Sequence, residues 1–445
     1  EVTMVKESEA SPKTNEIEAY FKKYPDMHRE VVIKEDILTQ GVWFTKAGIK
    51  LTEGAEPDSR WLFSYDLVKM EDADKEIANK SPSGMTFKGG IYKLRTTDVR
   101  ISLNPDAPYV VDDLEGKPVL RAGGAVIADV EFGPIPPHYG KFTADGTPYP
   151  AVARIATDSL FVTLFRFCQF WGQNEECKFC DINENARQLK KTKSSTFAGP
   201  VKNVEHVAEV LDYLFHVPLP PEWRPRFYTL SGGAILNTLH GLKEDDFYMS
   251  YVEAVKERIG NRWPLKLQTG PKDKATFKRY KAAGVDVHDA NMEVWDKRLF
   301  EWICPGKAGK VGWDEWVKKT VDSVDVFGEG NVSPNFVCGV EMAEPYGFKD
   351  VDEAVKSTSE GLEFYMSHGV LPRMNHWCRE GGSALAGSKT PPLDFYLKIH
   401  RARFEIWSKY RLPAYERMQL GPGRGGVGFC RYSQSSVEDM GPVYP

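Results

Sequence analysis

Three cysteines lie within the segment CQFWGQNEECKFC, which spans residues 168–180. Eight residues separate Cys168 from Cys177, and two residues separate Cys177 from Cys180. Cysteine thiolates are common protein ligands of zinc and of iron–sulfur clusters, so this spacing predicts a metal centre. Three thiolates on one short loop suit a [4Fe–4S] cluster whose fourth iron is open to another ligand.

A zinc site is the alternative interpretation of the same segment. Zinc in proteins prefers four tetrahedral ligands, often supplied as two close pairs. The segment supplies one close pair and one distant cysteine, and it contains no histidine. A fourth zinc ligand would have to come from elsewhere in the chain, for example from His288 or Cys378. The spacing favours the cluster and leaves zinc as an alternative.

The composition is that of a globular chain with no basic excess. Of its 445 residues, 41% are hydrophobic and 27% are charged, and the formal net charge is −5. Nucleic-acid surfaces need clustered Lys and Arg, and the apolar stretches are too short for a membrane span. The acidic start of the chain lacks the pattern of a secretory signal. We therefore expect a cytoplasmic protein that binds neither nucleic acid nor membranes, and whose seven cysteines serve metal or catalytic roles.

Strand and helix patterns alternate after residue 155 in six consecutive units. Strands are expected at residues 159–167, 226–233, 264–270, 285–294, 331–341 and 370–377. Four of the helices that follow them are expected at residues 203–217, 244–260, 274–284 and 313–328, and the last two at 350–369 and 391–411. This alternation implies a parallel sheet with right-handed crossovers. We predict an α/β fold with a partial (β/α)6 TIM-type barrel over residues 156–412, an N-terminal β-containing accessory region over residues 1–155 and a C-terminal extension over residues 413–445.

Glycines and polar residues follow the predicted strands at the points where the strands end. Beyond the cysteines, these are Ser231, Gly232, Gly233, Gln268, Asn291, Glu293, Glu341, Arg373, Asn375 and His376. Active sites of barrels lie at the carboxyl ends of the strands, so we expect these residues to share one mouth. Adjacent glycines let backbone approach a bound group closely, and carboxylates at such positions can bind sugar hydroxyls. The last strand end is the expected substrate contact, through Arg373, Asn375, His376 and Trp377.

The order of these segments resembles the radical S-adenosylmethionine (SAM) superfamily. A cysteine loop follows the first strand and SGG the second, while HDANMEVW and VSPNFVCGVE resemble segments of biotin synthase and lipoyl synthase. The interval of eight residues between the first two cysteines is longer than in the usual superfamily motif. That interval and the PGK at residues 305–307 resemble a radical SAM family found beside nitrilases in a bacterial gene cluster. The likeness runs from about residue 140 to about residue 380.

The resemblance implies roles for individual residues. Cys168, Cys177 and Cys180 would hold a [4Fe–4S] cluster, and SAM would bind its open iron. The implied SAM contacts are Phe179 at the adenine, Ser231, Gly232 and Gly233 at the methionine moiety, Asn291 and Glu293 at the ribose, and Gln268. Many family members have Glu after the two glycines, where this chain has Ala234, so Ser231 or backbone carbonyls would take the SAM amino group.

The resemblance also implies a reaction and its partners. A reduced flavodoxin or ferredoxin would supply an electron through the cluster to SAM, which would break into methionine and a 5′-deoxyadenosyl radical. The radical would abstract hydrogen from a small-molecule substrate held in the barrel. Such a site must exclude water and reductant, because the radical attacks nearby C–H bonds.

Four cysteines remain outside the loop. Cys304, Cys338 and Cys378 lie on or just after predicted barrel elements, and Cys430 lies in the glycine-rich GPGRGGVGFCRY. Free cysteines are often small buried hydrophobes. Biotin synthase-like enzymes, however, hold a second cluster inside the barrel, and Cys338 is expected to be able to face inward. The sequence thus leaves three functions open: a radical SAM enzyme on a small organic substrate, a sulfur-insertion enzyme with an auxiliary iron–sulfur cluster, and a zinc-stabilised α/β binding protein.

Overall fold

The fold was analysed in a computed structural model of the chain. It describes residues 11–55, 75–156, 159–192, 199–219, 225 and 227–412. Contacts divide the chain into two units, the first ending at Ile135 and the second beginning at Pro136. Cys430 and the rest of residues 413–445 lie outside the described residues.

The first unit is a six-stranded sheet with short helices. Its strands pair in the order β1-β4-β5-β6-β2-β3, with all pairs antiparallel except β1 with β4. The strands are β1 (Trp43–Phe44), β2 (Gly84–Gly89), β3 (Leu94–Arg100), β4 (Tyr109–Leu114), β5 (Lys117–Ala122) and β6 (Ala125–Glu131). The helices are α1 (Pro12–Lys23), α2 (Arg29–Gln40), α3 (Lys46–Lys50) and α4 (Lys75–Lys80).

The second unit contains every strand predicted after residue 155, each shorter than expected. The strands are β7 (Arg154–Ala156), β8 (Ser159–Thr163), β9 (Phe227–Ser231), β10 (Leu265–Gln268), β11 (Val287–Asp289), β12 (Asn335–Cys338) and β13 (Arg373–His376). Strands β8 to β11 are parallel and pair in chain order, and β7 is antiparallel to β8. Strands β12 and β13 form a parallel pair. Two isolated parallel bridges connect this pair to the chain around β11: His288 of β11 pairs with Val332, and Glu293, just after β11, pairs with Phe336 of β12.

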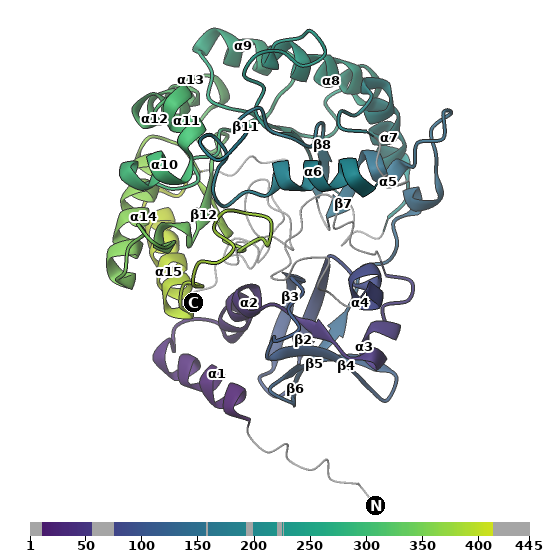
Figure 1. Cartoon of the computed structure of the whole chain (residues 1–445), viewed down its shortest axis with the longest axis vertical. Coiled ribbons are helices and arrows are strands. Elements are labelled where there is room, and N and C mark those ends of the chain that lie inside the picture. The colour runs from purple at the N-terminus through teal and green to yellow at the C-terminus, as the bar shows by residue number, and fades with distance from the viewer. Residues whose placement is uncertain are drawn as a thin grey trace, which may run out of the picture. The chain divides into compact units, whose positions relative to one another are not determined.

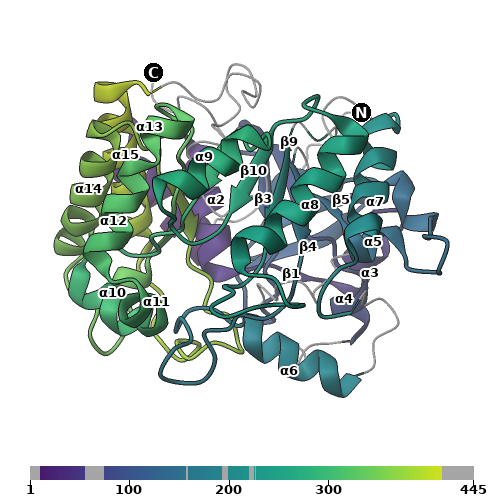
Figure 2. The ribbon, with the colours of Figure 1, turned by 90° about the horizontal axis from the view of Figure 1, so that it is seen from above.

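Helices cover one face of these strands (Figure 1, Figure 2). The shorter ones are η2 (Pro137–Gly140), α5 (Tyr149–Val152), α10 (Lys297–Ile303), α11 (Pro305–Lys310), α13 (Val324–Phe327) and η4 (Val340–Met342). The longer ones are α6 (Ile182–Thr192), α7 (Val204–His216), α8 (Glu244–Ile259), α9 (Lys274–Ala282), α12 (Trp313–Asp322), α14 (Val351–Ser367) and α15 (Leu393–Tyr410). Helix α7 shows how the local sequence forms a helix. The side chain of Asn203, its N-cap residue, accepts hydrogen bonds from two N–H groups in the first turn, and the apolar stripe of the helix is buried.

Alternation along the strands separates an outer face, against the helices, from an inner face. Three side chains contact the helices and so define the outer face. Tyr228 lies under Lys256 of α8, His288 contacts the Phe277 ring of α9, and His376 stacks on Tyr396 of α15. Leu230 and Leu267, which are opposite each other in the register, are buried in the core on the same side. Residues one position away point to the other side. The inner face therefore carries the polar residues Thr163, Thr229, Ser231, Lys266, Gln268, Asp289, Asn335, Arg373 and Asn375, together with the apolar residues Phe161, Phe227, Val287 and Val337. The charged residues on this face contrast with the branched apolar residues that fill a closed TIM barrel.

The mixed α/β class is confirmed, and the described strands do not form a closed barrel. They form a five-stranded and a two-stranded sheet in the second unit, so the partial (β/α)6 barrel stays a prediction. Helices α6, α10 and α11 were not predicted from the sequence. Helices α10 and α11 are short, and Pro305 interrupts the chain where they meet, so no helical repeat marks them.

Glu341 does not face a strand-end mouth. Its side chain is buried in η4 and accepts hydrogen bonds from the Gly339 N–H, at 2.6 Å, and from the Thr358 hydroxyl. Burial raises the pKa of the Glu341 carboxyl from 4.5 to about 7. The carboxylate thus caps the turn that follows β12.

The raised pKa of Glu341 predicts a pH dependence of stability. A carboxyl whose pKa is higher in the folded protein costs stability when it ionises, so stability is lost as the pH rises from 4.5 to about 7. Glu341→Gln should remove this loss, which is about 1.4 kcal/mol per pH unit. Thermal unfolding at about pH 5 and about pH 8 measures it. A Tm difference between variant and wild type that is the same at both pH values would contradict the prediction.

Candidate functional site

The cysteine loop begins just after β8 and ends at α6. Cys168, Cys177 and Cys180 are free thiols, and all three are half-buried. The Cys168 sulfur accepts a hydrogen bond from the Ala234 N–H at 3.3 Å. The Asn183 side chain of α6 in turn accepts from the Cys168 N–H at 2.7 Å, which fixes the start of the loop.

Three separate segments hold the loop. The Gln169 N–H donates to the Ala234 carbonyl, after β9, at 2.9 Å. The Lys178 N–H donates to the Ile303 carbonyl, at the end of α10, at 2.8 Å. The Leu385 N–H, beyond β13, donates to the Lys178 carbonyl at 3.0 Å. Backbone hydrogen bonds to three parts of the fold give the loop a defined position without regular secondary structure.

The glycine turn after β9 packs directly against the cysteine loop. A Cβ atom on Gly233 would lie 2.1 Å from the Phe167 carbonyl oxygen and 2.6 Å from the Cys168 Cα. A Cβ on Gly232 would lie 2.4 Å from the Phe165 ring. Only glycine lets the two segments approach this closely. The structure therefore brings the predicted SGG turn and the first predicted cluster ligand into contact.

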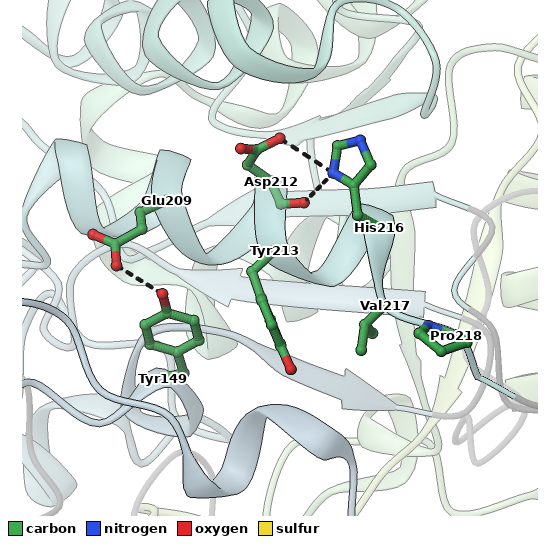
Figure 3. A pocket seen from close by; sticks show the side chains of 7 residues that line it. All are labelled: Tyr149, Glu209, Asp212, Tyr213, His216, Val217 and Pro218. Carbon is green, nitrogen blue, oxygen red and sulfur yellow. Dashed lines mark hydrogen bonds and ion pairs between the residues drawn. The ribbon is translucent and has the colours of Figure 1, made fainter.

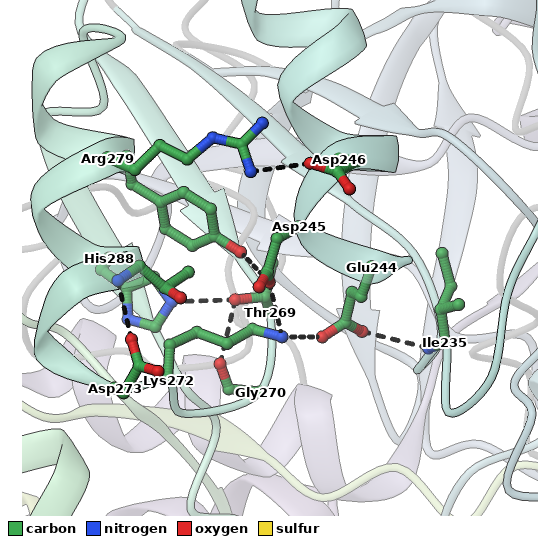
Figure 4. Close-up of polar contacts among 12 residues, drawn as sticks. Ile235, Glu244, Asp245, Asp246, Thr269, Gly270, Lys272, Asp273, Arg279 and His288 are labelled. Atoms are coloured by element: carbon green, nitrogen blue, oxygen red, sulfur yellow. Dashed lines mark hydrogen bonds and ion pairs between the residues drawn. The ribbon is translucent and has the colours of Figure 1, made fainter. Parts of the chain in front are cut away.

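A network of charged side chains contacts the chain just after the Gly232–Gly233 turn (Figure 4). Glu244, at the first turn of α8, accepts a hydrogen bond from the Ile235 N–H at 3.0 Å and pairs with Lys272. Lys272 also lies 2.9 Å from Asp245, and the Tyr280 hydroxyl donates to Asp245 at 2.8 Å. The network ties the glycine turn to α8 and α9, so its members position the site from outside it.

Asn291 and Glu293 lie on a strained segment after β11. Glu293 has φ of +68°, which is uncommon for a residue other than glycine and is often found at functional sites. The Asn291 side chain accepts a hydrogen bond from the Asn335 N–H at 3.1 Å. The Lys307 ammonium lies 2.6 Å from the Glu293 carboxylate and donates to the Asn291 carbonyl at 3.1 Å.

Lys307 belongs to the PGK segment and is a site residue to which the sequence assigned no role. The segment also contacts the cysteine loop, because the Gly306 N–H donates to the Glu175 carbonyl at 3.1 Å and a Cβ on Gly306 would clash with Phe170 at 2.4 Å. The sequence feature that could have indicated Lys307 is the PGK segment, which entered the sequence analysis only through the family resemblance.

Electrostatics link Lys307 to the thiols. A hydrogen bond from the Cys304 thiol and the Lys307 charge lower the pKa of Cys177, although burial opposes this. Burial raises the pKa of Cys168 to about 11 and that of Cys180 well above its usual range, and each interacts with Cys177. Burial also raises the pKa of the Glu293 carboxyl, with Lys307 opposing. The site thus holds a cation beside Cys177, whose pKa is lowered, and near two further thiols whose pKa burial raises.

Some predicted residues are brought together and others are not. Ser231 and Gln268 end neighbouring strands on the inner face, and Phe179 is half-buried against the core. Among the described residues, no three Cys, His, Asp or Glu side chains are already close enough to one another to hold a metal ion. Cys168 and Cys180 each interact electrostatically with Cys177.

The other cysteines have distinct positions. Cys304, at the junction of α10 and α11, lies fully buried beside Cys177. Cys338 is opposite His376 in the β12–β13 register and so faces the helices, which corrects the expectation that it could face inward. His288, a suggested zinc ligand, is likewise on the outer face, where its Nε2 lies 3.0 Å from the Thr269 hydroxyl. His376 and Arg373, both expected to contact substrate, lie on opposite faces of β13.

One pocket lies outside this region (Figure 3). Its volume is about 480 Å³, and it is lined by Tyr149, Glu209, Asp212, Tyr213, His216, Val217 and Pro218. The Tyr149 hydroxyl donates to Glu209 at 2.7 Å. None of its lining residues is one of the predicted site residues. No helix among the described residues is both long and apolar enough to span a bilayer.

Comparisons with known proteins give limited likeness. No protein-family model matches the chain. Over 141 residues it is 26% identical to the bacteriochlorophyllide c C-7(1)-hydroxylase of Chlorobaculum limnaeum. The match covers 32% of this chain and 32% of that protein, so it spans about a third of the relative's length.

Solved structures of similar shape include two proteins described as enzymes of radical SAM chemistry. The first is coproporphyrinogen III oxidase (HemN) of Escherichia coli, which matches at 11% sequence identity and a TM-score of 0.33 and covers 58% of this chain and 54% of its own. The second is the cobalamin-dependent enzyme OxsB, which matches at 11% sequence identity and a TM-score of 0.31 and covers 74% of this chain and 44% of its own. The [FeFe]-hydrogenase maturase HydG of Carboxydothermus hydrogenoformans matches at 13% identity and a TM-score of 0.37, covering 57% of this chain and 51% of that one. At such TM-scores the likeness carries no argument about this chain.

Proposed function

We propose that the chain is a radical SAM enzyme acting on a small organic substrate. In this proposal Cys168, Cys177 and Cys180 hold a [4Fe–4S] cluster. The observation that carries it is the packing of one three-cysteine loop against both a glycine turn and the PGK segment that bears Lys307. The proposal makes residues 156–412 a partial (β/α)6 barrel, residues 1–155 an accessory region and residues 413–445 an extension, in a cytoplasmic protein.

The donor set fits such a cluster. Three thiols share the loop, the Ala234 N–H already donates to one of them, and a cation lies nearby to offset thiolate charge. A bound cluster and SAM would supply a 5′-deoxyadenosyl radical for hydrogen abstraction from the substrate, with flavodoxin or ferredoxin as the proposed electron donor.

The protein's own groups would bind and orient SAM. Gly232 and Gly233 let the turn after β9 pack directly on Phe165 and on the cysteine loop, which brings the backbone of this turn beside the proposed cluster ligand Cys168. Asn291 and Glu293 are proposed to hold the ribose hydroxyls, with Phe179 at the adenine and Ser231 and Gln268 as further contacts. Lys307, which pairs with Glu293 here, is proposed as the cation that pairs with the carboxylate of SAM.

Anaerobic reconstitution with iron and sulfide tests the proposal. After reduction with dithionite and addition of SAM, the wild type should bind about four iron atoms per chain and release 5′-deoxyadenosine. Cys168→Ala should lose both iron and product, because it removes a ligand. Cys338→Ala, whose side chain faces the helices, is the matched control and should keep both. Full product formation by Cys168→Ala would sink the proposal.

A zinc-stabilised binding protein is the second candidate, because a fourth thiol, Cys304, lies beside Cys177. Four thiolates would complete a tetrahedral zinc site. Cys304→Ser separates the two candidates: it should abolish a four-thiolate zinc site and spare a three-thiolate cluster. Colourless protein that binds zinc, loses it in Cys304→Ser and leaves SAM intact would favour the binding protein. The sulfur-insertion alternative needs a second cluster and loses its expected ligand, since Cys338 faces the helices.

A further inference from the structure

A buried lysine occupies the inner face of the sheet. Lys266 in β10 is 1% exposed, and its ammonium lies 2.9 Å from Oδ2 of Asp289 in β11. The Arg373 guanidinium of β13 donates to the same oxygen. Central strands of parallel sheets are normally apolar, and a buried ion pair is often no more stable than apolar residues of similar size. Charges from three strands on one face therefore call for a functional explanation.

Four oxygen atoms on this face lack a hydrogen-bond partner among the described residues, and Thr163 Oγ1 and Asn375 Oδ1 are two of them. The other two are Oδ1 of Asp289, which is 0% exposed, and Oδ1 of Asn335, which is 4% exposed. Asn335 is opposite Arg373 in the β12–β13 register, so its side chain is on the same face. Buried polar atoms nearly always have partners, and an unsatisfied one points to a missing ligand or water. O–H or N–H groups of a ligand would satisfy both atoms.

The face is close to the proposed SAM contacts without belonging to them. Lys266 precedes Gln268 by two residues on the same strand, so its Cα lies about 6 to 7 Å further from the carboxyl end. Thr229, opposite Lys266 in β9, has the same relation to Ser231. Asp289 is opposite Gln268 in the β10–β11 register, so a molecule that contacts both Lys266 and Asp289 would extend from below the row of Ser231 and Gln268 up to that row.

We infer that this inner face binds a small carboxylic acid that also carries a hydroxyl or amino group. The acid group contacts the Lys266 ammonium, while the hydroxyl or amino group donates to Asp289 Oδ1 and Asn335 Oδ1. We expect acids without a hydroxyl or amino group to bind more weakly, because they would leave Asp289 Oδ1 and Asn335 Oδ1 without a hydrogen-bond donor. The inference deepens the proposed function and rests on it, since this acid is the substrate of that enzyme.

Calorimetric titration of the full-length, anaerobically reconstituted protein tests the inference. The probes are L-lactate for a hydroxy acid, L-alanine for an amino acid, and acetate for an acid with no donor. L-Lactate or L-alanine should bind at least about tenfold more tightly than acetate. Whichever of the two binds identifies the donor group.

Two variants separate recognition from folding. Lys266→Met should abolish binding of every acid, whereas Lys202→Met, which removes an equally buried lysine that donates to the Val152 carbonyl, should not. Asn335→Ala, whose amide oxygen has no partner to lose, should weaken L-lactate or L-alanine and leave acetate unchanged. Iron content and SAM binding are measured on the same samples, and both should persist in Lys266→Met.

Three results would overturn the inference. They are the absence of binding by both L-lactate and L-alanine, affinities equal to that of acetate, and loss of SAM binding together with acid binding in Lys266→Met, which would assign the lysine to the cofactor. Wild-type protein that binds the acid but neither iron nor SAM would instead overturn the proposed function.

Discussion

Gly233→Ala is expected to abolish cluster assembly. The added Cβ would lie 2.1 Å from the Phe167 carbonyl oxygen and 2.6 Å from the Cys168 Cα, far inside normal contact distances. Both atoms belong to the backbone, so no side-chain rotation relieves the clash. The cysteine loop must move away from the glycine turn, which breaks the hydrogen bonds from the Ala234 N–H to Cys168 and from Gln169 to Ala234. Overpacking of this kind costs about 1–3 kcal/mol or more.

Iron content after reconstitution and the Tm of the variant measure this effect. Gly140→Ala is the matched control, because a Cβ at Gly140 meets no atom within 4 Å. The control should reconstitute and unfold like the wild type. Iron content at the wild-type level in Gly233→Ala would show that the loop is not held by this contact, and would remove the main structural support for the proposed cluster.

Lys307→Met is expected to destabilise the protein and to weaken SAM binding. Glu293 is 7% exposed, and its carboxylate would lose the ammonium that lies 2.6 Å away. Breaking a buried ion pair by removing one partner costs about 3–5 kcal/mol, because the remaining charge is buried without compensation. The same substitution also removes the positive charge that lowers the pKa of Cys177. Chemical denaturation and equilibrium dialysis with SAM measure the two effects separately.

A double variant tests whether the stability loss and the binding loss have different causes. Adding Glu293→Gln to Lys307→Met removes the uncompensated carboxylate and should restore most of the stability, whereas SAM binding should stay weak. Lys310→Met, in the same helix at an exposed position, is the control and should match the wild type in both measurements. Wild-type SAM affinity in Lys307→Met would exclude Lys307 from the cofactor site.

The order of strands and helices was predictable because apolar runs and helical spacing of apolar residues are visible in short segments of the sequence. The apolar run at the start of the second unit predicts β8, and the spacing of Val207, Leu211 and Leu214 predicts α7, whose Asn203 cap follows the usual rule. The short helices α10 and α11 were missed because Pro305 and the glycines of PGKAGK leave no helical repeat. Without these helices, the sequence could not place Cys304 and Lys307 beside Cys177, where a hydrogen bond from Cys304 and the charge of Lys307 lower the pKa of that thiol.

Facing directions could not be predicted, because a shift of one residue in a strand moves every side chain to the other face. The sequence placed Cys338, Arg373 and His376 at strand ends with no means of telling inside from outside. The register of β12 with β13 and the stacking of His376 on Tyr396 turn Cys338 toward the helices. The same register leaves Arg373 on the inner face with Lys266 and Asp289.

The sequence by itself determined the chemical components: three thiols at a fixed spacing, a glycine pair and a succession of parallel strands, because each depends only on residue type and local periodicity. Only the tertiary structure decided which components meet. It placed Gly233 against Cys168, Lys307 against Glu293, and Lys266 against Asp289. These contacts join residues that are at least fourteen positions apart, and often many more, so they depend on how the strands pair and on which face each side chain takes.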